Sequence, residues 1–133
     1  MSVYYVDTSA ALKLLAEESD SQAFAQFYDD NADATWASSA LLRIEVVHAV
    51  RRALPAALND ARDLLLAFDY VNIDDGIVQA AMDEPDRSLR SLDAIHLATA
   101  RLFDSDLDGL VTYDERLGQA AIAAGMTVLS PRD

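Results

Sequence analysis

The 133-residue sequence contains no cysteine, only two histidines, four glycines and three prolines. The absence of cysteine excludes disulfide bonds, thiolate nucleophiles, iron–sulfur clusters and cysteine-based zinc sites. It is also in keeping with a reducing compartment. Because His48 and His96 are the only histidines, a three-histidine zinc site within one chain is excluded as well.

Long apolar runs are also missing. The longest stretch without a charged residue, Leu117–Pro131, has 15 residues and is interrupted by Gly118, Gln119 and Gly125. A membrane-spanning helix needs about 20 apolar residues. Near the N-terminus, Asp7 falls where a signal peptide requires an apolar residue. We therefore expect a soluble cytoplasmic protein with no membrane partner.

Positive charge is scarce. The chain has 10 Lys and Arg against 23 Asp and Glu, a net charge of −13. Most of these carboxylates are expected to lie on a solvated surface. Such a charge argues against nucleic-acid binding, since affinity for phosphate comes from Lys and Arg. This objection weakens if some carboxylates bind divalent cations, which reverse the sign of the local field.

The length fits one domain, and apolar residues recur alternately at strand and helix spacing. We expect strands at 3–6, 34–37, 70–73, 109–113 and 126–129. Helical spacing is found around 10–15, 24–28, 39–54, 56–69, 75–82, 92–102 and 115–124. Strands that alternate with helices imply a parallel sheet covered on both faces. We predict a single three-layer α/β/α domain over residues 1–133, with a central parallel sheet.

Short polar residues precede several of these helices and predict where they begin. The expected caps are Ser19 or Asp20, Ser38 and Ser39, Asp74 and Asp75, and Asp114. Pro55 is expected to end one helix or to open the next. Gly125 is expected to close the last helix.

Four acids are expected at one edge of the sheet, where open parallel sheets bind ligands. Asp7 and Asp114 follow strands, Asp93 lies in the first turn of a helix, and Glu45 lies within an apolar helical run. Taken singly, each Asp could be a helix cap, and Glu45 could pair with Arg43. Clustered carboxylates cannot all stay ionised without a cation. Oxygen ligands favour Mg²⁺ or Mn²⁺.

At these positions the sequence resembles the PIN-domain ribonucleases, and in particular the VapC-type toxins of bacterial toxin–antitoxin pairs. The resemblance is carried by VYYVDTSAALKLL, LRIEVVHAV, SLDAIHLATA and LVTYDERLGQAAIAAGMTVLSP, in that order. It covers nearly the whole chain and implies a PIN-like fold. The most specific part is LDAIHLATA followed by LVTYDERL.

By position, the resemblance implies metal-binding acids and two supporting hydroxyls. The acids are Asp7, Glu45, Asp93 and Asp114, and the hydroxyls are those of Ser9 and Thr112. Toxins of this type cut RNA with Mg²⁺ or Mn²⁺, form homodimers, and are inhibited by a cognate antitoxin that places a basic side chain near the acids. Apolar residues in the N-terminal helices also favour a homodimer.

The expected chemistry is endoribonuclease cleavage by a water molecule that a bound metal ion activates. Cations near the acids would be needed to position RNA. Arg51, Arg52 and Arg116 are candidates for this role, although the sequence favours a solvated charge or a partner of a carboxylate for each of them.

Three other interpretations are open. Residues 104–115, DSDLDGLVTYDE, match the calcium-loop pattern D-x-D-x-D-G-x₅-E. Glu45 with His48, and Asp93 with His96, have the spacing found in di-iron helical bundles. A di-iron bundle would contain no strands. If the chain is not such a bundle, both histidines are expected at the edge of the core or beside the metal ligands. Finally, the domain could bind a partner and cut nothing.

Overall fold

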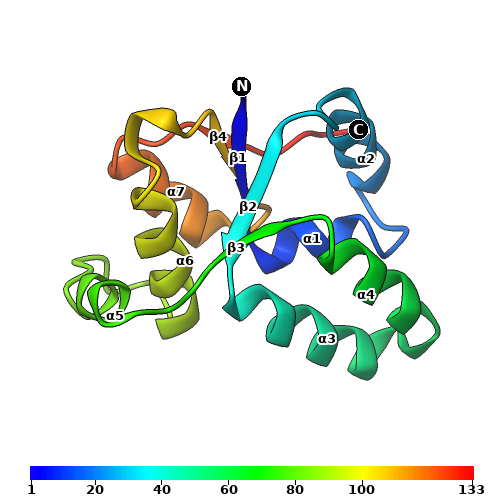
Figure 1. The fold of residues 1–133 in the computed structure, drawn as a ribbon, viewed down its shortest axis with the longest axis horizontal. Helices are drawn as coiled ribbons and strands as arrows, with labels where there is room; N and C mark the ends of the chain where they lie inside the picture. The colour runs from blue at the N-terminus through cyan, green and yellow to red at the C-terminus, as the bar shows by residue number, and fades with distance from the viewer.

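The computed structural model describes all residues from 1 to 133 and contains five strands (Figure 1). The strands are β1 (Val3–Val6), β2 (Thr35–Ser39), β3 (Asp69–Val71), β4 (Gly109–Val111) and β5 (Val128–Leu129). The α-helices are α1 (Thr8–Lys13), α2 (Ser21–Asp30), α3 (Leu41–Ala53), α4 (Leu58–Leu65), α5 (Asp75–Met82), α6 (Ser91–Arg101) and α7 (Glu115–Ala123). Two short 3₁₀ helices are η1 (Pro55–Ala57) and η2 (Asp104–Asp106).

The five strands form one parallel sheet in the order β3-β2-β1-β4-β5. The first strand of the sequence is thus the central strand, and Tyr5 pairs with Ala37 on one side and with Leu110 on the other. Because all strands run in the same direction, their carboxyl ends meet at one edge of the sheet. Asp7 therefore follows the middle of this edge, and Asp114 follows the neighbouring strand β4.

Because successive side chains of a strand point to opposite faces of the sheet, they pack into two separate cores. Val6 and Val111 face a core shared with α1 to α4, whereas Tyr5 and Leu110 face a core shared with α6 and α7. Helix α5 packs against α6 (Figure 1). The predicted three-layer α/β/α arrangement with a central parallel sheet is confirmed.

Most of the expected boundaries are close to the observed ones, with two corrections. Ser38 does not cap a helix, because β2 extends through Ser38 and Ser39 and α3 begins at Leu41. The N-cap position is Ala40, and Ser39 contributes only by accepting the Leu41 N–H on its hydroxyl at 3.1 Å. The Ser38 hydroxyl instead donates to the Val6 carbonyl, 2.6 Å away. The segment 56–69 is also not one helix: after Pro55 opens η1, α4 ends at Leu65.

Three other local signals can be compared with the structure, and two of them behave as expected. Asp74 and Asp114 cap α5 and α7 by accepting backbone N–H bonds, and Gly125 closes α7 with φ at +89°. Asp20 occupies the N-cap position of α2, but its side chain makes no capping bond there.

The calcium-loop interpretation of residues 104–115 is wrong. Asp104 and Asp106 lie in η2, before β4, whereas Glu115 begins α7 after that strand. Since β4 is paired on both sides, the two ends of the motif lie at opposite edges of the sheet. The di-iron interpretation is wrong as well, because the fold is built on a sheet and His48 is exposed at the surface.

The apolar residues of the N-terminal helices do not form an exposed face. Ala10, Ala11 and Phe24 are fully buried, and the remaining large apolar side chains of α1 and α2 pack against the same core. Apart from Met1, the large apolar residues that are exposed lie from α3 onward. None of the helices has the length and apolar character required to span a bilayer.

Candidate active site

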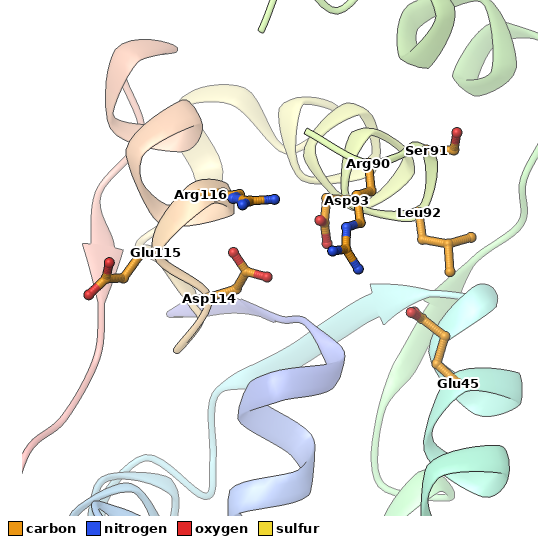
Figure 2. A pocket seen from close by; sticks show the side chains of 8 residues that line it. All are labelled: Glu45, Arg90, Ser91, Leu92, Asp93, Asp114, Glu115 and Arg116. Carbon is orange, nitrogen blue, oxygen red and sulfur yellow. The ribbon is translucent and has the colours of Figure 1, made fainter. Parts of the chain in front are cut away.

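A pocket of about 810 Å³ opens at the carboxyl edge of the sheet. It lies between the start of α6, the start of α7 and the side of α3 (Figure 2). Three of the four predicted acids line it. The lining residues are Glu45, Arg90, Ser91, Leu92, Asp93, Asp114, Glu115 and Arg116.

Asp7 does not line this pocket and is only 3% exposed, but its charge acts on Asp93, which does line it. It follows β1 and caps α1, accepting the Ala10 N–H at 3.0 Å. Its carboxylate also accepts the hydroxyls of Thr112 at 2.6 Å and of Ser9 at 2.8 Å. Burial raises the pKa of Asp7, and these donors oppose the rise without cancelling it. The two hydroxyls named from the resemblance therefore hold Asp7 in one orientation.

Glu45 extends from the middle of α3 and is partly buried. Its Oε1 atom accepts the Thr8 hydroxyl and the Nε2 atom of His96, each at 2.8 Å. Burial alone would raise the pKa of Glu45, but the hydrogen bonds from His96 and Thr8 outweigh it and lower this pKa. The expected pairing with Arg43 is absent, since Arg43 lies over the Tyr70 ring.

Asp93 occupies the first turn of α6 and carries the clearest electrostatic signal of the site. Burial raises the pKa of its carboxyl group, and the negative charges of Asp114, Asp7 and Glu45 raise it further. Helix α6 begins after Arg90 without a side-chain cap. Helix capping therefore does not account for an aspartate at position 93. Its side chain lies instead among other acidic side chains.

Asp114 has two roles that are compatible with each other. Its Oδ1 atom accepts the Leu117 N–H at 3.1 Å and so begins α7. Its carboxylate faces Asp93 across the pocket, whereas the neighbouring Glu115 points away (Figure 2).

The structure thus brings all four predicted acids to one place. As the side chains stand, no group of three or more acidic or histidine residues converges closely enough to bind one ion together. The donor set nevertheless consists of carboxylate oxygens whose charges repel one another at Asp93. Both properties fit Mg²⁺ or Mn²⁺, which take oxygen ligands and relieve such repulsion.

Two arginines share the pocket with the acids. Arg90 and Arg116 are both exposed, and their guanidinium groups extend toward Asp93 (Figure 2). Arg116 was expected from the sequence. Arg90 was missed, although its position three residues before Asp93 was a usable signal, and the expected Arg51 and Arg52 do not line the pocket.

Comparison with known sequences identifies the family of the chain. The PIN domain family model matches residues 4–123. This chain belongs to the PIN domain family. It is 42% identical over 129 residues to Ribonuclease VapC35 of Mycobacterium tuberculosis, with 96% of each chain covered.

Solved structures show the same fold at lower identity. The Mycobacterium tuberculosis toxin VapC20, described as cleaving the sarcin–ricin loop, superposes with a TM-score of 0.76 at 17% identity, covering 96% of this chain and 99% of that one. A chain of a toxin–antitoxin complex from Klebsiella pneumoniae gives a TM-score of 0.70 at 21% identity, covering 100% and 99%. The PIN-like fold implied by the sequence motifs is therefore confirmed.

Proposed function

We propose that this PIN domain is the toxin of a toxin–antitoxin pair and an endoribonuclease that depends on Mg²⁺ or Mn²⁺. The observation that carries the proposal is the position of Asp93, which lines a pocket with two other acids and two arginines and whose pKa is raised by burial and by the charges of Asp114, Asp7 and Glu45. The 42% identity to a named ribonuclease, over 96% of both chains, supports the choice of RNA as substrate.

Asp7, Glu45, Asp93 and Asp114 are the residues that would bind the metal. When bound, the metal would lower the pKa of a coordinated water molecule and stabilise negative charge on the scissile phosphate. Ser9 and Thr112 keep Asp7 from rotating by donating to its carboxylate.

Arg90 and Arg116 supply the positive charge that RNA needs in a chain of net charge −13. Guanidinium groups bind phosphate oxygens through paired N–H donors. With the acids on one side and the arginines beside them, a phosphodiester can be bound at the pocket without contact with the acidic remainder of the surface.

The direct test is cleavage of a structured RNA by the purified protein. We expect cleavage with Mg²⁺ or Mn²⁺ and none with EDTA. The products should carry 5′-phosphate and 3′-hydroxyl ends, because water displaces the 3′ oxygen without help from the ribose 2′-hydroxyl. Products with a 2′,3′-cyclic phosphate, or cleavage that persists in EDTA, would contradict the metal mechanism. Mn²⁺ binding without cleavage of any RNA would favour a domain that only binds a partner.

The partner that we propose is a cognate antitoxin in the cytoplasm, with a basic side chain that enters the acidic pocket. The similarity in fold to a toxin from a toxin–antitoxin complex supports this choice, as does the carboxylate lining of the pocket. Coexpression with the product of a small neighbouring open reading frame should yield a stable complex that no longer cuts RNA. Replacing the antitoxin's basic residue should restore cleavage within the complex.

A further inference from the structure

We propose that Tyr5 and His96 are positioning residues, which form a hydrogen-bonded relay that fixes Glu45 and leaves its Oε2 atom for the cation. The proposal rests on the proposed function for the ligand role of Glu45, but the relay itself can be tested without RNA or metal. It assigns a purpose to the buried histidine of the LDAIHLATA motif.

The relay connects three elements across the carboxyl edge of the sheet. Tyr5 comes from the central strand β1 and is fully buried. Its Oη atom is 2.7 Å from Nδ1 of His96 on α6. The other ring nitrogen of His96, Nε2, is 2.8 Å from Oε1 of Glu45 on α3. Helices α6 and α3 cover opposite faces of the sheet, so His96 bridges the two helical layers.

One assignment of donors and acceptors satisfies every member of this relay. The backbone N–H of Ser39 can only donate, and it does so to Tyr5 Oη at 3.1 Å. The Tyr5 hydroxyl then donates its own hydrogen to Nδ1 of His96. An accepting Nδ1 leaves the ring hydrogen on Nε2, from which it is donated to Glu45.

The opposite tautomer is unfavourable for the same reason. It would place a lone pair of Nε2 against the Glu45 carboxylate at 2.8 Å and would direct an N–H toward the Tyr5 oxygen. A buried acceptor without a donor is costly, whereas every buried side-chain polar atom of this structure has a partner.

Two donors converge on a single oxygen of Glu45. Both Thr8 and His96 bond to Oε1, which leaves Oε2 as the atom available to a cation. His96 itself is 1% exposed and uses both ring nitrogens. It therefore acts through Glu45 rather than on substrate.

The first experiment reads the tautomer of His96 from its ring ¹⁵N chemical shifts in the metal-free protein. The expected result is a single Nε2–H tautomer, which gives way to a mixture in the Tyr5→Phe variant, since that change removes the donor to Nδ1. An Nδ1–H tautomer in the unaltered protein would overturn the relay, whether or not the protein cuts RNA.

The second experiment measures Mn²⁺ affinity by electron paramagnetic resonance. Because partners of metal ligands typically contribute about 10- to 100-fold in affinity, His96→Leu should weaken Mn²⁺ binding by that factor. His96→Gln, whose amide can donate from near the Nε2 position, should recover most of the loss. The control His48→Leu, on the exposed side of α3, should leave the affinity unchanged.

The two experiments distinguish failure of the relay from failure of the proposed function. A folded His96→Leu or Tyr5→Phe protein that binds Mn²⁺ as tightly as the unaltered chain would overturn the positioning role. If His96→Leu does not fold, Tyr5→Phe replaces it, with an expected weakening in the same direction. Failure of the unaltered chain to bind Mn²⁺ would instead count against the proposed function, while the tautomer would still decide whether the relay exists.

Discussion

The carboxyl group of Asp93 is ionised at neutral pH only at the expense of folding stability. Its native pKa lies above the ordinary value, because of burial and of the charges of Asp114, Asp7 and Glu45. A raised native pKa of an acid means that the folded state binds the proton more tightly than the unfolded state does. Stability is therefore lost as the pH rises through the native pKa. The contribution of Asp93 to the stability of the metal-free protein is thus least favourable at the pH at which its carboxylate is ionised and ready to bind a cation.

Asp93→Asn should stabilise the metal-free protein while abolishing its activity. Asparagine has nearly the same shape without the charge, so the melting temperature at pH 7 should rise by roughly 2–4 °C for each 1 kcal/mol of relieved repulsion. The gain should vanish below about pH 4, where aspartate is protonated in both states. RNA cleavage should fall by more than about 100-fold, beyond the usual loss for partners of metal ligands.

Calorimetry with and without Mn²⁺, beside a cleavage assay, measures all three effects. Asp63→Asn, on the exposed side of α4, is the matched control and should change neither stability nor cleavage appreciably. Wild-type cleavage in Asp93→Asn, with an unchanged shift in melting on addition of Mn²⁺, would remove Asp93 from the site.

Arg116→Ala should weaken RNA binding more than the chemical step. The side chain lines the pocket but is exposed, so its role is to attract and hold phosphate in a screened environment. We expect a higher KM with a nearly unchanged kcat. The slope of log Kd against log salt concentration should fall by about one, as for the loss of one phosphate contact. Arg62→Ala, on α4 and outside the pocket, should leave both quantities unaltered; an equal loss there would indicate a nonspecific effect of charge.

At the scale of elements, three helices begin with an aspartate from the adjoining loop, but α2 begins differently. Asp7, Asp74 and Asp114 cap α1, α5 and α7 through their own side chains. For α2, the carboxylate of Asp133 accepts the N–H groups of Asp20 and Ala23, at 2.8 and 3.0 Å. The cap of this helix therefore comes from the opposite end of the sequence.

Asp133→Ala should consequently lower the free energy of unfolding by about 1 kcal/mol, the usual cost of losing an N-cap. The loss should appear in chemical denaturation as a lower midpoint with an unchanged slope. Glu17→Ala, an exposed acid in the loop before α2, should have almost no effect. Equal stability of the two variants would show that the long-range cap contributes nothing.

At the scale of the whole molecule, a homodimer remains a prediction, and the structure changes where the second copy would bind. Exposed apolar side chains gather on α5 and α6 rather than on the N-terminal helices. Val78 and Met82 of α5 are 44% and 72% exposed and line a groove against Ile95 of α6. Leu92, at the start of α6, is 47% exposed. Burial of this groove would be the favourable part of association, and the repulsion between two chains of charge −13 would oppose it.

Sedimentation should therefore show a dimer that tightens as salt is added, since ions screen the repulsion between the acidic chains. Met82→Glu should shift the equilibrium toward monomer by placing a further charge in the apolar groove. Leu66→Glu is the control, because Leu66 is 85% exposed on the far side of the fold, at the end of α4. A monomer at every concentration and salt, or equal effects of both changes, would contradict dimerisation through α5 and α6.

Local information in the sequence was sufficient for the fold, and it singled out four acids that the structure places near one another. The order of strands and helices follows from hydrophobic periodicity, which each segment carries by itself. The parallel sheet then follows from their alternation, and it brings together Asp7, Asp93 and Asp114, because the carboxyl ends of parallel strands share one edge. The boundaries near Ser39 and Leu65 were less accurate. Ser39 belongs to β2, which pairs with β1 and β3, and Leu65 ends α4. The ends of such elements depend on the neighbours against which they pair and pack, and not only on their own residues.

Only the tertiary structure decided which side chains meet. Glu45 and His96 are 51 residues apart and lie on opposite layers of the fold, so their hydrogen bond exists only because both helices pack against the same edge of the sheet. Arg90 enters the pocket, and Asp133 caps α2, for the same reason. Such contacts depend on the angles and distances at which distant elements pack, and periodicity along the chain carries no information about them.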